Sequence, residues 1–479
     1  MSLRKQAISG TFWTALASTV LAVIQILRLS ILTRFLEKSD FGLVAIVVLV
    51  LGFTQIFTDL GISISLFSRH DITKKEYSSL YWVSLLLGGF LYIVVSLSAP
   101  LVATFYNQPE LALLIPVMGL DLVFSTAGRQ FRIFRQKELK FKSLALIDIV
   151  TSAISLGIAV WVASEGGGAW SIVYSTLFAS FTSSVLLIIS GLRSHPLVWY
   201  INFSEGKSFY KVGLFQTGSQ ILDYVSSQLD VIIIGKLMGT AELGVYNLVK
   251  QLVMRIYALV NPILTRVFIP LLAKLNEDLP LLKAHYLKML NIAAFVNFAI
   301  YGAIALSARE LLTIIYGPTF ANSAIILQLL CLWGGVASVM NCASSLIVAT
   351  GKTELGFRWT IVRVIANPVF IIVGYQYGLI GIAVAQMLYA LVFYSFYWAL
   401  VIRKILEMLS YAEYLKTISY FLLCSASLFV ILTYLKTYLV SSQNIWVTLI
   451  PFGIMYLLGY AAVNRHLIMS LLGTYLKKA

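Results

Sequence analysis

Apolar runs of about 20 residues recur along this chain from one end to the other. A helix needs about 20 predominantly apolar residues to cross the hydrocarbon core of a bilayer. Only 11% of the 479 residues are charged, whereas a soluble domain carries about 25%. The chain also lacks a polar stretch long enough for a second, soluble domain. The sequence therefore predicts an all-α integral membrane protein with about 14 transmembrane helices.

The charged breaks between the apolar runs set the approximate ends of each predicted span. The predicted spans are 9–35, 41–66, 79–105, 111–131, 143–163, 169–192, 212–235, 242–270, 286–307, 320–348, 358–375, 379–402, 417–435 and 445–463. Arg4 and Lys5 precede the first run, as basic residues precede the apolar core of a signal peptide. The run is too long for such a core, and no small-residue cleavage site follows it, so we expect an uncleaved first span.

Positive charges alternate between the loops. Most of the cations gather in every second loop, and the intervening loops hold only Lys38, Lys236, Arg309 and Lys436. Cytoplasmic loops are enriched in Lys and Arg, so this pattern predicts that both termini lie in the cytoplasm. The same loops account for the net charge of +15 without a nucleic-acid site. The outer loops are short, which leaves no room there for an enzymatic domain.

Two segments of the chain resemble each other. Residues 31–42 align with residues 233–244, so that Gly42 meets Gly244. The span before each segment carries polar residues on one helical face, namely Thr14, Ser18, Gln25 and Arg28 in the first and Gln216, Gln220, Asp223, Ser227 and Asp230 in the second. An even number of spans separates the two copies. The sequence therefore predicts two pseudo-symmetric six-helix bundles in parallel orientation.

This repeat divides the chain into four parts. Residues 1–192 form an N-lobe with spans one to six, and residues 212–404 form a C-lobe with spans seven to twelve. Residues 193–211 connect them, and their mixture of aromatic and polar residues predicts an amphipathic helix at the inner membrane interface. Residues 405–479 hold two extra spans and a cytoplasmic tail. The two extra spans carry no charge, and we expect them to pack against lipid or the second lobe.

A few ionisable residues lie deep inside the predicted spans: Arg28, Asp121, Asp223, Asp230, Lys250 and Arg255. A charge at the bilayer centre costs about 2.5–3.5 kcal/mol on insertion scales, so such groups are expected to face a wet cavity or one another. Other arginines, among them Arg363, lie near the predicted span ends, where long side chains can reach the interface. A structural interpretation stays open, because Arg28 and Asp230 could form an ion pair between the lobes and polar stripes can join helices.

The deep cations favour a particular kind of cargo. Arg28, Lys250 and Arg255, with the neighbouring amides Gln25, Asn247 and Gln251, would line a cationic, hydrogen-bonding cavity. Arginine binds phosphate in a forked, two-bond geometry, so the cavity would suit a phosphate or diphosphate group. Asp121, Asp223 and Asp230 are candidates for ion coupling or for a structural pair.

Motifs for enzymatic chemistry are weak. Gly351-Lys352-Thr353 resembles the end of a phosphate-binding loop, but the glycine required five residues earlier is Leu346. The three cysteines lie within apolar segments, and the four histidines lack the spacing of metal ligands. We therefore expect no catalytic residue, no metal and no cofactor.

Six short blocks are spread over most of the chain: Met1-Ser-Leu-Arg-Lys with Ile8-Ser9-Gly10, Asp40-Phe41-Gly42, Arg129-Gln-Phe-Arg132 with Gln136-Lys-Glu-Leu139, Tyr246-Asn247-Leu248, Asn261-Pro-Ile-Leu-Thr-Arg266 and Leu327-Gln-Leu-Leu-Cys331. In their order and spacing these blocks resemble the WzxC-like polysaccharide flippases of the MOP (multidrug/oligosaccharidyl-lipid/polysaccharide) exporter superfamily. The last two spans resemble the family only in hydrophobicity. The resemblance implies two six-span bundles around a central cavity, two extra spans and a bacterial inner membrane.

The resemblance also implies a function. It implies a transporter that moves undecaprenyl-diphosphate-linked oligosaccharide to the outer leaflet by alternating access, coupled to H⁺, Na⁺ or the membrane potential, alongside polysaccharide assembly machinery. One alternative is a drug or organic-ion antiporter of the same superfamily, for which twelve spans and an acidic cavity would be expected. Another is a membrane-embedded polysaccharide polymerase or ligase, which would need a large outer loop.

Overall fold

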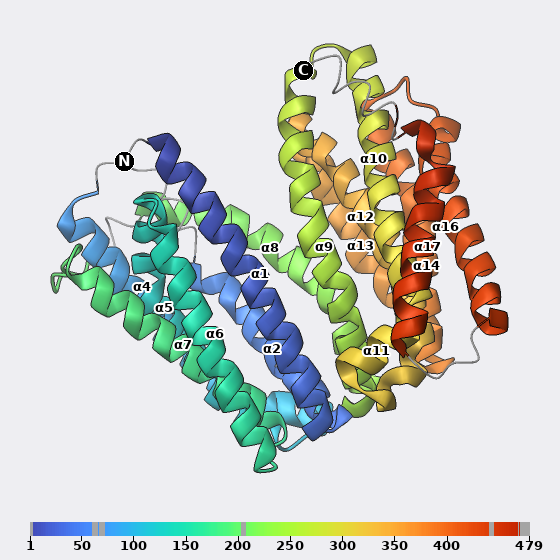
Figure 1. Cartoon of the computed structure of the whole chain (residues 1–479). Helices are drawn as coiled ribbons and strands as arrows, with labels where there is room; N and C mark the ends of the chain where they lie inside the picture. Colours follow the sequence, from blue (N-terminus) through green and yellow to red (C-terminus); the bar gives the residue numbers. More distant parts are fainter. Residues whose placement is uncertain are drawn as a thin grey trace. The chain divides into compact units, whose positions relative to one another are not determined.

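The chain divides into two compact units in the computed structural model. The model describes residues 3–59, 66, 72–202, 207–439, 445–467 and 469, except for the side chains of 3–8, 59, 207–217, 219, 439, 446 and 447. Unit 1 comprises Met1–Val245 and unit 2 comprises Tyr246–Ala479. Every regular element in the described part is a helix (Figure 1).

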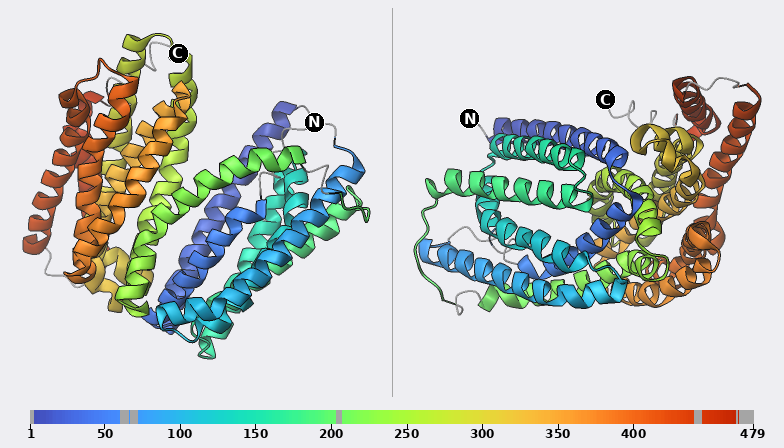
Figure 2. Two further views of the ribbon diagram at one scale, coloured as in Figure 1. Left: turned by 180° about the vertical axis from the view of Figure 1, so that it is seen from behind. Right: turned by 90° about the horizontal axis from the view of Figure 1, so that it is seen from below.

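Unit 1 is a bundle of long helices. They are α1 (Leu3–Phe35), α2 (Lys38–Asp59), α4 (Lys74–Tyr106), α5 (Leu111–Lys137), α6 (Phe141–Ser164), α7 (Ala169–Leu192) and α8 (Lys207–Leu237). Helix α6 packs between α1 and α7, and α5 packs between α4 and α7. Helix α2 packs against both α5 and α8 (Figure 2). The following helix, α9 (Thr240–Lys274), begins in unit 1 and continues into unit 2.

Unit 2 contains the rest of α9 and a second set of long helices. They are α10 (Leu279–Leu306), α12 (Ala324–Thr350), α13 (Thr353–Tyr375), α14 (Gly378–Tyr397), α16 (Tyr411–Leu439) and α17 (Ile445–Val463). Shorter elements connect them: α11 (Ala308–Tyr316), the 3₁₀ helix η1 (Pro318–Ser323), the π-helical turn η2 (Trp398–Ile402) and α15 (Arg403–Ile405). Helix α10 packs against α12 and α16, and α13 packs against α14.

The helices match the predicted spans closely. Twelve described helices are long and apolar enough to cross a membrane. The predicted spans 212–235 and 445–463 are also helical, as α8 and α17, but only part of their side chains is described, and neither is among the twelve. The all-helical membrane fold is therefore confirmed. The count of fourteen and the cytoplasmic placement of both termini stay predictions.

The distribution of side chains suits a lipid environment. Leu97 and Leu101 on α4 are each 74% exposed, whereas Asn297 and Ser338 in unit 2 are fully buried. Exposed aliphatic side chains over the length of a helix would be costly in water, and lipid removes that cost. Buried polar groups need partners inside the protein, and Asn297 donates to the carbonyl of Ala293, 2.9 Å away.

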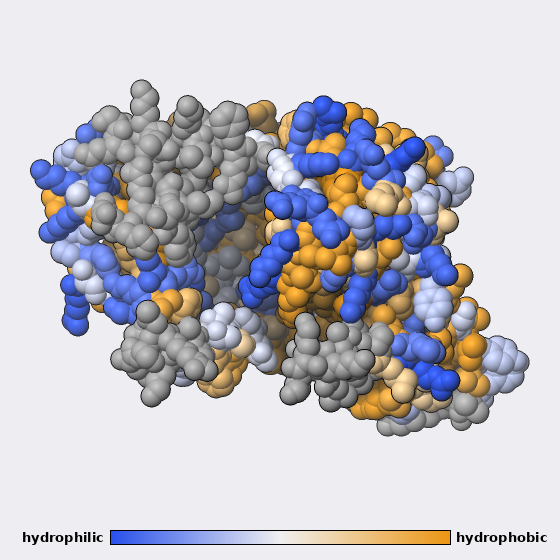
Figure 3. All heavy atoms as spheres, turned by 90° about the horizontal axis from the view of Figure 1, so that it is seen from above, coloured by the Kyte–Doolittle hydropathy of each residue, from blue (hydrophilic) through white to orange (hydrophobic). Residues whose placement is uncertain are grey.

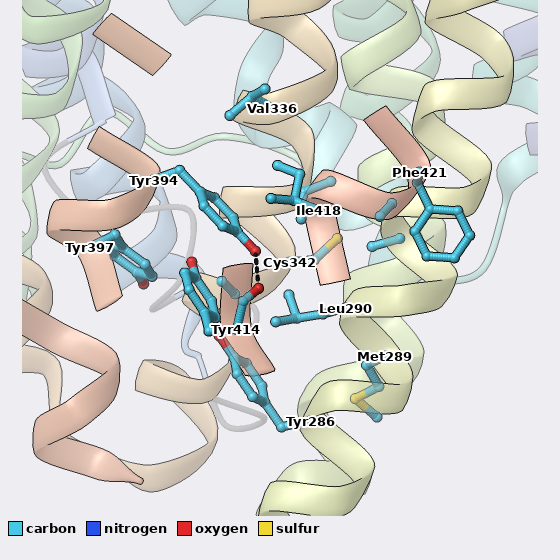
Figure 4. Close-up of a cluster of buried hydrophobic side chains, with 14 of the residues drawn as sticks. Tyr286, Met289, Leu290, Val336, Cys342, Tyr394, Tyr397, Tyr414, Ile418 and Phe421 are labelled. Atoms are coloured by element: carbon cyan, nitrogen blue, oxygen red, sulfur yellow. Dashed lines mark hydrogen bonds between the residues drawn. The ribbon is translucent and has the colours of Figure 1, made fainter. Parts of the chain in front are cut away.

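Tyrosines contribute much of the unit 2 core. Tyr286, Tyr394, Tyr397 and Tyr414 are all buried within one apolar cluster (Figure 4). The rings of Tyr394 and Tyr414 stack with their centres 4.4 Å apart. The Tyr394 hydroxyl donates to the carbonyl of Tyr414 over 3.3 Å, drawn as a dashed line in Figure 4. Each ring thus buries a large apolar surface while this hydroxyl keeps a hydrogen-bond partner.

The predicted inner loops of unit 2 meet at one end of the unit. Lys352 donates to the carbonyl of Lys404 over 3.3 Å, and Lys283 lies 2.9 Å from the Glu413 carboxylate. Figure 3 looks onto this end, where hydrophilic side chains gather. At the opposite end, Lys436 forms an ion pair of 2.7 Å with Glu310. The alternation of loops read from the sequence therefore corresponds to two real ends of this unit.

The connection between α7 and α8 differs from the prediction. Residues 193–202 are not helical, so the amphipathic helix expected over 193–211 is wrong for this described part. The segment runs along the start of α4 instead, where Val198 N–H donates to Ser78 Oγ (3.1 Å) and Asn202 N–H donates to Ser79 Oγ (2.8 Å). Pro196 disfavours a helix here, and the two serines offer the backbone alternative partners. The position of the segment at the membrane interface stays a prediction.

The two compact units and the predicted lobes are different divisions of the chain. Helix α8, which the sequence repeat assigns to a C-lobe over 212–404, packs against α2 within unit 1. The repeat pairs segments of similar sequence, whereas each unit is a part of the chain whose residues are in dense contact with one another. The lobe boundaries at 192, 212 and 404 therefore stay predictions.

Candidate functional site

Helix α1 places Gln25 and Arg28 on its polar face, one turn apart. The Gln25 side chain is exposed within unit 1 and Arg28 is half-buried. The Arg28 guanidinium donates to Ser155 Oγ on α6 over 3.1 Å, and Ser155 in turn donates to the carbonyl of Ser175 on α7 over 2.9 Å. This chain of hydrogen bonds holds the guanidinium against two helices.

Asp121 lies near the middle of α5 among polar residues from two other helices. Gln55 on α2 donates from Nε2 to Oδ2 of Asp121 over 3.2 Å. Ser180 on α7 is a second hydrogen-bond partner, and Arg129 on α5 is a neighbouring charge. Because Gln55 is exposed within the unit, this carboxyl group is connected to the unit surface through a polar side chain. Asp121 is thus part of a polar cluster with side chains from α2 and α7.

Helix α8 carries Asp223 and Asp230 in contrasting environments. Asp223 is exposed within unit 1, whereas Asp230 is only 4% exposed. Oδ1 of Asp230 accepts from the backbone N–H of Val231 over 2.9 Å. Ser227, between them on the predicted polar stripe, is exposed. The side chain of Gln216, at the start of the stripe, lies outside the described residues.

Helix α9 carries the remaining predicted residues in unit 2. Asn247, Lys250, Gln251 and Arg255 are all half-buried, and their spacing places them on one side of the helix. Arg255 lies close enough to Tyr316 on α11 to act electrostatically on its hydroxyl group. That hydroxyl donates to the carbonyl of Leu248 over 3.0 Å, which joins the end of α11 to α9.

The structure adds Arg363 to the candidate residues. The sequence assigned this arginine to a span end, because the predicted span began at 358. Helix α13 begins at Thr353, which moves Arg363 to the middle of the helix. There it lies close enough to act electrostatically on the hydroxyl groups of Tyr257 on α9 and of Tyr389 and Tyr397 on α14. A better estimate of the start of α13 would have revealed this position from the sequence.

The aligned glycines of the repeat make reciprocal contacts within unit 1. A Cβ atom on Gly42 would lie 1.9 Å from the carbonyl oxygen of Thr240, and one on Gly244 would lie 1.9 Å from that of Lys38. Lys38 and Thr240 are themselves partners in the alignment of the two segments. The first turns of α2 and α9 therefore cross at a junction that only glycine permits. This reciprocity supports the repeat read from the sequence.

Asp40, in the same block as Gly42, fixes the adjoining turn. Its Oδ2 accepts from the backbone N–H of Glu37 (2.9 Å) and its Oδ1 from that of Ala169 at the start of α7 (3.0 Å). One carboxylate thus satisfies backbone donors at the beginnings of two helices. The block Asp40-Phe41-Gly42 is a structural junction.

Comparison with known proteins places the chain in a family. Residues 31–325 match the family model described as polysaccharide biosynthesis protein. The chain belongs to that family. The resemblance seen in the sequence blocks is thereby confirmed, and the protein is a multi-pass protein of the bacterial inner membrane.

Known relatives align with most of the chain. The chain is 29% identical over 402 residues to an uncharacterized membrane protein in the cps region of Klebsiella pneumoniae, covering 83% of each chain. It is 26% identical over 418 residues to the lipopolysaccharide biosynthesis protein WzxC of Escherichia coli, covering 87% of this chain and 84% of the relative.

The fold is similar to that of the lipid II flippase MurJ in its inward closed conformation. The TM-score is 0.72 at 14% identity, and the match covers 95% of this chain and 99% of that chain.

Proposed function

We propose that this protein is a flippase that moves undecaprenyl-diphosphate-linked oligosaccharide from the cytoplasmic to the outer leaflet. Membership of the polysaccharide biosynthesis family is the observation that carries this proposal, because lipid-linked sugars made at the inner leaflet must cross the membrane. The fold shared with a lipid II flippase supports it. Alternating access between the two leaflets would let the polar head group cross while the lipid tail stays in the bilayer.

The head group in this proposal is bound by the intramembrane cations. In unit 1, Arg28 on α1, with Gln25, would supply charge and hydrogen-bond donors for a diphosphate. In unit 2, Lys250 and Arg255 on α9, with Asn247 and Gln251, would do the same. Arg363 on α13 is a further donor of the same kind. A cation kept inside an apolar span is costly unless an anion or a polar partner offsets that cost. A transported diphosphate is such an anion.

The proposed flipping activity can be tested with the purified protein in liposomes. A fluorescent polyprenyl-diphosphate oligosaccharide is placed in both leaflets, and a membrane-impermeant reductant destroys the fluorescence of the outer leaflet. Protein-free liposomes should lose about half of the signal, and liposomes with the protein should lose nearly all of it. Equal loss in both preparations, together with uptake of organic cations by the protein, would favour the antiporter alternative.

In this proposal Asp121 is the ion-coupling residue, because the exposed side chain of Gln55 is hydrogen-bonded to its carboxyl group and connects it to the surface of the unit. Asp223 is the second candidate, and the buried Asp230 suits a structural role. We expect Asp121→Asn to flip the lipid without a gradient but to lose most of the stimulation by an imposed pH gradient, because the amide does not ionise. The measurement is the initial flipping rate with and without the gradient.

Glu110→Gln provides the matched control for Asp121→Asn. Glu110 precedes the same helix, is exposed, and makes no side-chain bond to the helix start. Its replacement should leave the gradient response unchanged. If Asp121→Asn responds normally and Asp223→Asn does not, the coupling group is Asp223.

A further inference from the structure

Unit 1 contains a cavity of about 490 Å³ that the proposed transport does not use. It lies between α6 and α7, at the end of the unit that carries basic loops. Its outer part is polar, with Lys140, Lys142 and Ser143 at the start of α6 and Ser190 near the end of α7. One turn further along both helices the lining becomes aliphatic, with Leu146, Ile147 and Leu186.

The cations of this cavity are held in place by their neighbours. The Lys142 ammonium lies 5.2 Å from the centre of the Trp13 ring on α1. Lys140 Nζ lies 2.8 Å from a carboxylate oxygen of Glu138, and Arg135 donates to Ser143 Oγ. Lys140 is therefore paired with a carboxylate, whereas Lys142 and Arg135 have an aromatic and a hydroxyl partner. The local charge is positive at the level where lipid head groups would lie.

The outer faces of the two helices are also suited to lipid. Leu146 and Val150 on α6 are 46% and 47% exposed, and Ile189 on α7 is 59% exposed. These side chains continue the aliphatic lining of the cavity along the helix surface. A ligand in the cavity would therefore meet positive charge at one end and a lipid-facing apolar surface at the other.

We propose that this cavity binds a phospholipid with an anionic head group as a resident lipid. Its phosphate would lie between Lys140 and Lys142, with hydrogen bonds from Ser143 and Ser190, and its acyl chains would follow Leu146 and the adjoining helix surface. Basic pockets between membrane helices on the cytoplasmic side bind acidic lipid head groups. A soluble anion would gain no binding free energy from the aliphatic part of the cavity. An apolar molecule would gain none from the lysines. The proposal is independent of the proposed transport activity.

The test compares lipid binding to the full-length protein and to a double variant. Purified protein in detergent is titrated with phosphatidylglycerol or phosphatidylcholine, and bound lipid is measured by native mass spectrometry. We expect the wild-type protein to prefer phosphatidylglycerol, and Lys140→Gln with Lys142→Gln to weaken its binding about tenfold or more. Lys74→Gln with Lys75→Gln is the matched control, because Lys75 lies at the same end of the unit and over an aromatic ring, with Nζ 5.8 Å from the Tyr200 ring centre.

Several outcomes would overturn the proposal. Equal weakening of phosphatidylglycerol binding in both double variants would show diffuse attraction to the basic end of the unit. Equal affinity of the wild-type protein for the two lipids would show that the charge of the head group is not recognised. Displacement of the lipid by inorganic phosphate alone would assign the cavity to a soluble anion. Ser190→Trp, which fills the cavity without changing its charge, is expected to lower phosphatidylglycerol binding as well. Unchanged binding by that variant would place the lipid elsewhere.

Discussion

Replacing either Gly42 or Gly244 by alanine is expected to destabilise the protein by about 1–3 kcal/mol, the usual cost of forcing extra atoms into a packed site. The added methyl group would meet a backbone carbonyl at 1.9 Å in both cases. A backbone atom cannot move aside as the end of a flexible side chain can, so the first turns of α2 and α9 must separate. The measurement is the free energy of unfolding in mixed micelles.

Because Gly42 and Gly244 make equivalent contacts at the junction, the effects of the two substitutions can be compared. Gly42→Ala and Gly244→Ala should cost similar amounts, and the double variant should cost less than their sum, because one separation relieves both clashes. Gly157→Ala on α6 is the control, since nothing lies within 4 Å of its added methyl group. That variant should be slightly stabilising, by about 0.5–1 kcal/mol, because alanine favours a helix. Junction variants as stable as this control would show that the two turns do not touch.

The positions of the helices could be predicted from the sequence because one physical constraint governs them. A bilayer span needs a long apolar run, and charge must lie outside it, so hydropathy and loop charge locate the spans. The prediction fails where that constraint does not act. Residues 193–202 lie between spans, and their course is decided by Ser78 and Ser79, which a hydropathy pattern does not reveal. The short helix α11 was missed for the same reason.

The candidate site could be predicted only in part. Intramembrane charge is visible in a sequence, so Arg28, Asp121 and Arg255 could be singled out. The partners of these groups come from other helices, as Ser155 does for Arg28 and Gln55 does for Asp121. Those contacts depend on how each helix is rotated about its own axis, and an apolar run in the sequence does not specify that rotation.

The blocks that carry the family resemblance are informative in a different way. Asp40 and Gly42 form a helix junction. Gln130 and Phe131 are buried between helices, and Arg132 pairs with Asp148 on α6 at 2.6 Å. These contacts hold the helices of unit 1 together. In the proposed flippase, the residues that select the cargo are expected elsewhere, on polar faces such as that of α9, where substitution leaves the fold undisturbed.

The intramembrane arginines give the second large effect. We expect Arg28→Ala and Arg255→Ala each to raise the KM for flipping of the lipid-linked oligosaccharide about tenfold or more, since a charge-assisted hydrogen bond contributes about 1.5–3 kcal/mol. Arg→Lys at either position should recover only part of the loss, because lysine keeps the charge but lacks the forked geometry for a diphosphate. Arg309→Ala, at an exposed position on α11, is the matched control and should leave KM unchanged.

Stability separates a role in cargo binding from a structural role for these arginines. Replacing a cargo-binding cation leaves no buried carboxylate behind, so the substitution should change the unfolding temperature little. An arginine kept for a structural ion pair behaves oppositely, because its removal strands a buried carboxylate, which costs about 3–5 kcal/mol. A raised KM with an unchanged unfolding temperature would support the cationic site. A lowered unfolding temperature with a normal KM would instead make Arg28 a structural partner, with Asp230 the first carboxylate to replace.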